Sequence, residues 1–437
     1  AMAVINRNPN RTHKKLFTEK QSGEKITLFV AADDREEAAY VVEAVRQGLR
    51  SNKHKPSDFA VMYRTNAQSR LLEEAFRREG INYRLVGAQR FYGRREVKDM
   101  IAYLRLVSNP KDEISLRRVI NLPPRGIGEK TLEKLAELAR TSELTLGEAV
   151  LRLSEPNSAE LLTALGREGT RLEQFGKRLA QWRHVAENNP PVILFDRVIE
   201  DTGYQTYIQD NSEEGQDRWE NVLELRQVVM EYAELPDFLE AMALVADQDT
   251  LPENVDTPTL LTLHAAKGLE FEHVFITGLD EMLLPHSRSR DDPEALEEER
   301  RLLYVGITRA KKSLTLTRAR RRRSPYGSYE ETQPSRFLDD LPQELLQGSP
   351  RGLPNRLNTS YQADYSRWEM PVHRQSVKAD VPQETRYKPG MQVRHKTYGR
   401  GVVKASRLEL GDETVEVYFE GYGLKALVAS LANLEVL

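Results

Sequence analysis

The feature that most constrains the fold is an alternation of strands and helices that stops near residue 108 and resumes near residue 259. Apolar runs and helically spaced apolar positions predict strands at 26–31, 59–63 and 83–86 and helices at 34–49, 67–79 and 94–107. After a stretch that shows only amphipathic helices, strands are predicted at 259–263, 274–277 and 314–317, with a charged helix at 293–308. Each flank alone has too few strands for a sheet. We therefore predict one α/β domain with a parallel sheet, interrupted by an all-helical insertion.

The composition changes again after the α/β pattern ends. Residues 348–382 are rich in Gln, Pro, Ser, Arg and Asn, as flexible linkers are. Short alternating runs such as Val415, Val417 and Phe419, punctuated by glycines, are typical of a small β-barrel. The predicted segments are the two parts of the α/β domain at 1–108 and 258–341, the helical accessory insertion at 109–257, a flexible linker at 342–385 and the barrel at 386–437.

Length and composition exclude several classes of protein. A chain of 437 residues suggests two to four domains at roughly 150 residues each. No run approaches the roughly 18 apolar residues that cross a bilayer, so we expect a cytoplasmic protein with no membrane segment. The chain has no cysteine, and none of its eight histidines pairs with another at ligand spacing along the sequence. We expect neither disulfides nor a metal site.

Charge is concentrated in one short segment. The net charge of −3 gives no global basic field, so any binding of nucleic acid must be local. Arg318 and the run 320–323 follow Lys311 and Lys312 closely. Such a run is equally often a solvated surface, and it needs support from neighbouring motifs.

Two blocks follow predicted strands of the α/β domain, where such folds bind ligands. In the first, Tyr63 and Arg64 end a strand; the ring could stack on a base and the guanidinium could meet a phosphate, or they could be a packing residue and a surface ion pair. The second is TLHAAKGLEF at 262–271, whose small residues allow close approach of a ligand and whose Glu270 could accept a ribose hydroxyl proton.

A third block, EEERRLLYVGITRA at 297–310, ends a predicted helix just before a strand. Arg309 at that point could stabilise charge on a transferring phosphoryl group, as an arginine finger does. Taken alone, an acidic and basic helix of this kind is usually a solvated face.

In this order, YRTNAQSR, TLHAAKGLEF and EERRLLYVGITRA resemble the second-motor-domain motifs of the UvrD/PcrA/Rep superfamily-1 DNA helicases. The resemblance extends to FYGRREVKDMIAYLRL at 91–106, the helical insertion, PSRF at 334–337 and the terminal barrel. It implies a RecA-like motor domain that faces ATP across a cleft. Tyr63 would stack on the adenine, Arg64 and Arg309 would contact the γ-phosphate, and Glu270 would bind the ribose.

The resemblance also implies translocation along single-stranded DNA from 3′ to 5′, in repair or replication. His286 and Tyr326 match base-contacting positions, the latter only with a one-residue insertion in the alignment. Further candidates for DNA contacts, mostly to the backbone, are Thr262, His264, Arg318, Ser335 and Arg336.

Two further regions have expected partners. Gly126, Ile127, Gly128, Lys130 and Thr131 precede or begin a predicted helix, where backbone N–H groups suit a phosphate of duplex DNA at a junction; alone, the segment is as often a tight turn. The barrel resembles the family's Tudor-like module, which implies docking on RNA polymerase or repair proteins. Its basic and aromatic residues could equally contact nucleic acid.

The chain departs from the family in one respect that concerns catalysis. No GxxxxGK[ST] phosphate loop occurs, and no acidic strand end is suited to Mg²⁺. We expect ATP and Mg²⁺ to need the missing first motor domain upstream of Ala1, and this chain to be a truncated, inactive half of a helicase. The alternative is a stand-alone DNA- and protein-binding fragment without catalysis. A RecB/AddA-like origin is disfavoured, since no nuclease carboxylate cluster follows.

Overall fold

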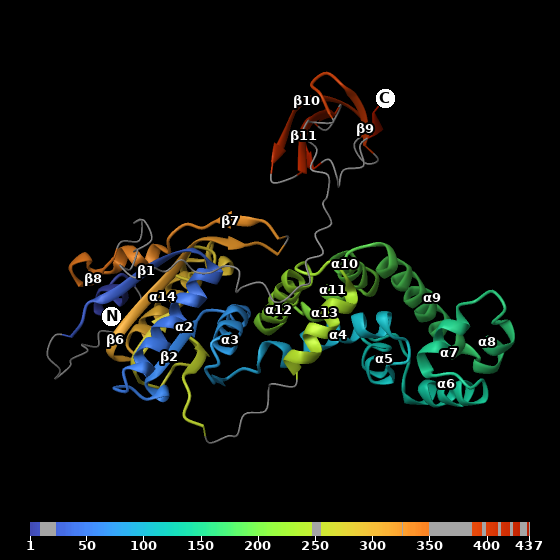
Figure 1. Ribbon diagram of the computed structural model, residues 1–437, viewed down its shortest axis with the longest axis horizontal. Coiled ribbons are helices and arrows are strands. Elements are labelled where there is room, and N and C mark those ends of the chain that lie inside the picture. The colour runs from blue at the N-terminus through green and yellow to red at the C-terminus, as the bar shows by residue number, and fades with distance from the viewer. Residues whose placement is uncertain are drawn as a thin grey trace. The chain divides into compact units, whose positions relative to one another are not determined.

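The computed structural model describes residues 1–8, 23–246, 255–325, 327–348, 387–395, 399–409, 412–419, 423–428 and 435–436. The chain divides into two compact units, Ala1–Ala363 and Asp364–Leu437, and each unit has a sheet of its own (Figure 1). Among the residues described, no helix is long and apolar enough to span a membrane.

The first unit is built on an eight-stranded sheet of order β3-β4-β2-β5-β6-β1-β8, with β7 paired to β6. Its strands are β1 (Ile26–Asp33), β2 (Phe59–Tyr63), β3 (Arg84–Val86), β4 (Thr259–Thr262), β5 (Phe271–Ile276), β6 (Ala310–Arg323), β7 (Tyr329–Glu331) and β8 (Leu346–Gln347). Every pairing is parallel except that of β6 with β7. Because β3 and β4 are neighbours, the chain leaves the sheet for the insertion and returns beside its point of departure. The prediction of one sheet from both flanks is confirmed.

Helices cover both faces of this sheet. They are α1 (Met2–Ile5), α2 (Asp34–Arg50), α3 (Ser69–Arg78) and α14 (Pro293–Ile307), with short 3₁₀ turns η1 (Pro56–Asp58), η2 (Asn66–Gln68), η4 (Ser287–Ser289), η5 (Arg336–Asp340) and η6 (Gln343–Leu345). Side chains alternate between faces along a strand. Val61 and Tyr63 therefore pack with the α2 and α3 core, whereas Ala60 and Met62 pack with the core that contains Leu303 of α14.

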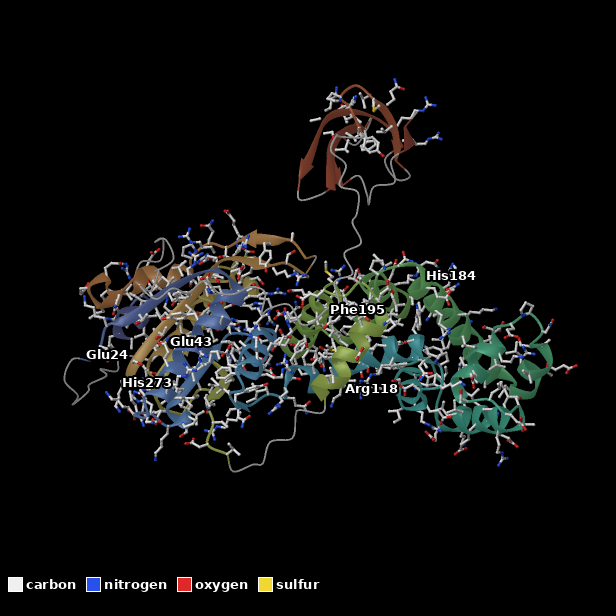
Figure 2. The ribbon with its side chains drawn as sticks, viewed as in Figure 1. Glu24, Glu43, Arg118, His184, Phe195 and His273 are labelled. Atoms are coloured by element: carbon white, nitrogen blue, oxygen red, sulfur yellow. The ribbon has the colours of Figure 1, made fainter. Side chains whose placement is uncertain are left out.

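Between β3 and β4 the described residues form helices only, as predicted (Figure 1). After η3 (Phe91–Gly93) come α4 (Arg95–Ser108), α5 (Glu113–Val119), α6 (Glu129–Thr141), α7 (Leu146–Leu153), α8 (Ala159–Leu165), α9 (Arg167–Asn188), α10 (Pro191–Thr202), α11 (Tyr204–Ile208), α12 (Glu213–Val229) and α13 (Leu235–Ala246). They share one apolar core that includes Trp182 and Phe195, the latter labelled in Figure 2. Helix α4 contributes Val97 and Met100 to this core, so it packs with the insertion and not on the sheet.

Strand β6 is longer than predicted and contains the arginine run. Arg318 is buried and its Nε donates to Asp280 at 3.1 Å, while Arg322 binds both Glu37 and Asp280 at 2.6 Å. Buried carboxylates beneath the strand neutralise these guanidinium groups, which is why a charged segment can continue the sheet. This extension was not predicted, because the carboxylates that pair with the arginines are distant in sequence.

The first residues of the predicted linker belong to the fold: β8 pairs in parallel with β1. Residues 349–385 of that linker lie outside the described residues. The second unit is an antiparallel sheet of order β12-β11-β10-β9-β13. Its strands are β9 (Gln392–His395), β10 (Gly399–Glu409), β11 (Asp412–Phe419), β12 (Gly423–Val428) and β13 (Glu435–Val436). Closure of this sheet into a barrel stays a prediction.

Candidate functional site: two edges of the eight-stranded sheet

At the amino-terminal edge of the sheet, Arg309 and Glu270 are neighbours. Phe271 of β5 and Ala310 of β6 are paired in register, so the residues that precede them lie side by side. The half-buried Arg309 donates from Nη1 to the carbonyl of Leu269 at 3.0 Å and from Nε to the carbonyl of Val305 at 3.0 Å. The guanidinium therefore ties the end of α14 to the residue before Glu270.

Glu270 is accessible at this edge. Its side chain is 60% exposed and lies 3.4 Å from Nζ of Lys311. The backbone of Gly268 has φ of +85°, a left-handed conformation that residues with a Cβ rarely adopt. A glycine is thus needed for the chain to turn into β5 with Glu270 outermost, and the arrangement offers one guanidinium and one carboxylate to a ligand.

Arg64 lies elsewhere, against Glu299 of α14. Its Nε donates to both oxygens of Glu299 at 2.9 Å, and its Nη2 donates to Oε1 at 2.6 Å. Arg309 follows ten positions later in the chain, a rise of about 15 Å along a helix. The expectation that Arg64 and Arg309 meet one γ-phosphate stays a prediction, because these contacts show only the present partners of each arginine.

Tyr63 is placed in the core. Its ring is fully buried among the residues that pack under α2 and α3, and burial raises the pKa of its hydroxyl. No ring face is left on the surface in this structure. The buried ring favours the packing role that the sequence also allowed, and stacking of Tyr63 on adenine stays a prediction.

The carboxyl-terminal edge brings together the loops after β2, β4 and β5. Tyr63 and Thr262 are paired in register, so Arg64 and the exposed His264 follow neighbouring strand ends. Partial burial lowers the pKa of His264, and the charge of Arg64 lowers it further. His286, after β5, donates its backbone N–H to Oε2 of Glu299 at 3.1 Å.

Helix α12 of the insertion packs against this edge. Glu220 lies 3.1 Å from Nε2 of the buried His286, and Asp217 accepts from Arg288 at 3.2 Å. Burial, and then the charge of Glu220, raise the pKa of Asp217. In this arrangement Glu220 and Asp217 of the insertion contact His286 and Arg288 of the sheet edge.

A cleft of about 600 Å³ opens between α12 and the sheet edge. Its lining carries carboxylates of Asp34, Glu37, Glu220, Glu224, Glu281, Glu330 and Glu331, against guanidinium groups of Arg322 and Arg323. Carboxylates outnumber cations, so the cleft in this arrangement is not a phosphate site.

The remaining candidates on the eight-stranded sheet are dispersed. Thr262 is half-buried and accepts from the backbone of Ala265 at 3.3 Å. Arg318 is buried in its ion pair and Ser335 is buried, so neither offers a surface to DNA here. Arg336 is exposed but is held by Glu281, with Nη2 2.7 Å from Oε2. Tyr326 lies outside the described residues.

The glycine loop of the insertion begins α6 as predicted. Gly126 has φ of +69° and its carbonyl accepts from Arg171 at 2.7 Å. Gly128 is the N-cap of α6 and makes no side-chain cap. Ile127 and Thr131 are buried, whereas Gly126, Gly128 and Lys130 are exposed. The exposed backbone of the first turn and one lysine are therefore available to an anion.

Sequence reasoning missed Glu299, which connects the loops of the carboxyl edge. A weak signal was present: Glu299, Leu302, Leu303 and Gly306 follow one another at helical spacing, and all four are buried. A carboxylate on the apolar stripe of a helix requires a buried partner. Among the described residues, no group of three or more His, Asp or Glu side chains is placed to hold a metal ion.

Comparison with known proteins identifies the family of this chain. The family of the UvrD-like helicase C-terminal domain matches residues 1–321. DNA helicase II of Escherichia coli (strain K12) is 36% identical across 100% of this chain and 59% of its own length. The ATP-dependent DNA helicases PcrA of Staphylococcus epidermidis (strain ATCC 35984) and Bacillus subtilis (strain 168) are 37% and 35% identical, across 99% and 100% of this chain. The chain spans about 60% of the length of the Bacillus protein.

Proposed function

The chain belongs to the UvrD-like helicase family, as the carboxy-terminal half of a UvrD/PcrA-type protein, and we propose that it supplies the second RecA-like motor domain of an ATP-dependent DNA helicase. The relatives named above are DNA helicases, and two of them are named as ATP-dependent. We further propose that the motor moves 3′ to 5′ on single-stranded DNA and acts in DNA repair or replication.

The observation that carries this proposal is the junction of Arg309 with the chain before Glu270. An arginine held by two backbone carbonyls has little conformational freedom to lose when it meets transition-state charge. Glu270 beside it is suited to a ribose hydroxyl. ATP would lie between this edge and a phosphate loop, with its Mg²⁺ ligands, supplied by residues outside this sequence.

We assign DNA binding to the carboxyl edge, where the exposed His264 follows Thr262 of β4 and His286 lies in the chain after β5. In this arrangement His286 is buried against Glu220 of α12, so it would reach DNA only when that contact opens. Residues 263–270 run directly from that edge to the nucleotide edge, because β4 and β5 are both parallel to β2. Residues 263–270 thus connect the proposed DNA site with the proposed ATP site. Movement along DNA requires such a link, since nucleotide contacts must bias the conformation that holds the strand.

The insertion and the second unit have proposed partners of their own. The exposed first turn of α6, with Gly126, Gly128 and Lys130, suits phosphates of the duplex at a single-strand to double-strand junction. The five-stranded second unit would be a Tudor-like barrel that docks on RNA polymerase or a repair protein.

The test is DNA-stimulated ATPase activity of three proteins: this chain, the chain joined to a phosphate-loop motor domain, and the joined protein with Arg309→Ala. We expect activity only in the joined wild type, and a loss of about 10³-fold or more with Arg309→Ala. Arg301→Ala, which changes an exposed arginine on the same helix, is the control. If the joined wild type binds DNA but does not hydrolyse ATP, the chain is a stand-alone binding module.

A further inference from the structure

A buried polar network joins helix α12 of the insertion to the turn after β2. Asn221 of α12 and Arg94, the residue before α4, are both buried. Oδ1 of Asn221 accepts from Nη1 of Arg94 at 2.6 Å, and its Nδ2 donates to Oε1 of Glu96 at 2.6 Å. A buried amide needs partners at both of its ends, so these two bonds fix its orientation. Helix α12 therefore offers Arg94 an acceptor with a defined direction.

Arg94 in turn holds both ends of the short turn η2. Its Nη1 also donates to the carbonyl of Asn66 at 3.0 Å, and its Nη2 donates to Oγ of Ser69 at 2.8 Å. Within the turn, Oε1 of Gln68 accepts from the backbone N–H of Arg64 at 2.9 Å. The backbone of Arg64 is thus fixed by a turn that Arg94 keeps in place.

The position of Arg94 depends on these acceptors. Burial lowers the pKa of its guanidinium, although the charge of Glu73 raises it in part. Glu73 lies 3.9 Å from Nη2, beyond hydrogen-bond distance, whereas the side chain donates to neutral oxygens of Gln89, Asn66, Ser69 and Asn221. A buried cation that loses a neutral acceptor is drawn toward the nearest carboxylate. Loss of the Asn221 amide should therefore move the guanidinium toward Glu73 and withdraw Nη1 from Asn66.

We propose that Asn221 is a positioning residue of the motor, which acts through Arg94 to hold the backbone of Arg64. This inference rests on the proposed function and takes Arg64 to act in ATP hydrolysis, as its motif implies. The helical insertion then contributes to the rate of hydrolysis through the turn after β2.

The test uses the protein joined to a phosphate-loop motor domain, with steady-state ATPase activity and melting temperature measured for each variant. Asn221→Ala removes an acceptor of Arg94, and we expect kcat to fall about tenfold, as for loss of one hydrogen bond to a charged group. The KM for ATP should change by less than about twofold, because an arginine that meets developing charge acts in the transition state more than in ground-state binding. The melting temperature falls as well, since Arg94 and Glu96 each lose a buried partner.

Val222→Ala is the matched control for stability. Val222 is the next residue of α12 and lies fully buried in the apolar core of the insertion. The change creates a small cavity and lowers the melting temperature, but it leaves the side chains of the polar network in place. Both kcat and KM should stay within about twofold of the wild type. A fall in kcat as large as that of Asn221→Ala would attribute both effects to stability and overturn the proposal.

An exchange of charge between Asn221 and Glu96 provides a rescue. Asn221→Asp alone keeps an acceptor for Arg94 but places a second carboxylate against Glu96, so kcat should fall. Glu96→Gln in the same protein supplies an amide that donates to the new carboxylate, and the net charge of the pair is unchanged. The double variant should recover kcat to within about threefold of the wild type. Recovery of the melting temperature without recovery of kcat would overturn the positioning role.

A double-mutant cycle tests whether Asn221 acts through Arg64. Arg64→Lys keeps a cation for Glu299 but loses the planar fork, so kcat should fall. Asn221→Ala in that background should lower kcat by less than about a further twofold, since the guanidinium that it positions is already gone. Losses that multiply would show that the two residues act independently, and the proposal would be wrong.

Two further outcomes distinguish this inference from the proposed function. If the joined wild type hydrolyses ATP and Asn221→Ala keeps kcat within about twofold of it, only the positioning role is overturned. If the joined wild type does not hydrolyse ATP at all, the proposed function itself is wrong, and the positioning role falls with it.

Discussion

Glu270 and Arg309 stand next to each other at the starts of two paired strands, β5 and β6, with the guanidinium of Arg309 bound 3.0 Å from the carbonyl of Leu269. They are separated by a whole helix in sequence. Their adjacency brings a carboxylate and a guanidinium together at the amino edge of the sheet, beside Lys311, and a ribose and a phosphoryl group would need such a pair.

The role of Glu270 can be tested by the sugar of the nucleotide. In the protein joined to a phosphate-loop domain, Glu270→Gln should raise the half-saturating ATP concentration about tenfold, since a charge-assisted hydrogen bond is lost. With 2′,3′-dideoxy-ATP the wild type and the variant should be alike, because neither has a hydroxyl to bind. Glu272→Gln, one position into β5 and paired with Lys312, is the control. Equal effects on both nucleotides would exclude ribose binding.

Arg318 is expected to matter for stability and not for DNA. Its guanidinium is buried against Asp280, whose own side chain is fully buried, and burial lowers the pKa of Arg318. Arg318→Met should lower the free energy of unfolding by about 3 kcal/mol, because Asp280 loses a buried partner. Urea denaturation measures this change.

The exposed Arg320 on the same strand provides the comparison. Arg320→Met should change the unfolding free energy by less than about 0.5 kcal/mol. Oligo-dT affinity should be unaffected by Arg318→Met in the folded protein. A loss of DNA affinity without a loss of stability would instead support the prediction that Arg318 contacts DNA.

A histidine pair makes the sheet sensitive to acid. Nε2 of His273, labelled in Figure 2, lies 3.0 Å from Nδ1 of His54, and Nδ1 of His273 lies 2.7 Å from Oγ of Ser313. Burial lowers the pKa of His273, and the charge of His54 lowers it further. Since the folded state disfavours the protonated imidazole, stability is present near pH 7 and is lost as pH falls through the ordinary histidine range.

We therefore expect the melting temperature to fall between pH 7 and pH 5, and to fall less in His273→Asn. The nearby charges of Asp58, Glu272 and Lys312 remain in that variant, so the difference between the two curves reports the imidazole pair. His184→Asn, which changes an exposed histidine of α9, should leave the pH dependence unchanged. Parallel curves for wild type and His273→Asn would contradict this prediction.

The loop before α6 can be tested by a matched pair of glycines. Gly126 and Gly203 both lie in the insertion with positive φ, at +69° and +66°. Either change to Ala costs about 1–2 kcal/mol for the left-handed backbone. At Gly126 the added Cβ would also displace the guanidinium of Arg171, whose Nη1 lies 2.7 Å from it, so Gly126→Ala should lose at least as much stability as Gly203→Ala. Only Gly126→Ala should weaken binding of a tailed duplex, whereas binding of oligo-dT stays unchanged in both. Equal duplex affinities in the two variants would remove this loop from the DNA interface.

The sequence was sufficient for the elements whose physics is local. Alternating apolar runs such as 59–63 predicted β2, and helical spacing with Asn109 and Pro110 beyond it predicted α4 and its end. The two flanking halves of the sheet followed from counting strands. The order of motifs at 262–271 and 297–310 also indicated the family, which the comparisons confirm.

Tertiary structure alone decided which charges are available. Tyr63 and Arg64 stand at a strand end, and Arg318 stands on a charged strand. Nothing in their spacing tells that Tyr63 packs in a core, that Arg64 pairs with Glu299, or that Arg318 pairs with Asp280. Their partners lie far away in the chain, and an ion pair depends on distance in space, not on separation in sequence. For the same reason the sequence does not reveal that Arg64 is paired with Glu299 of α14, which lies 235 positions away in the chain.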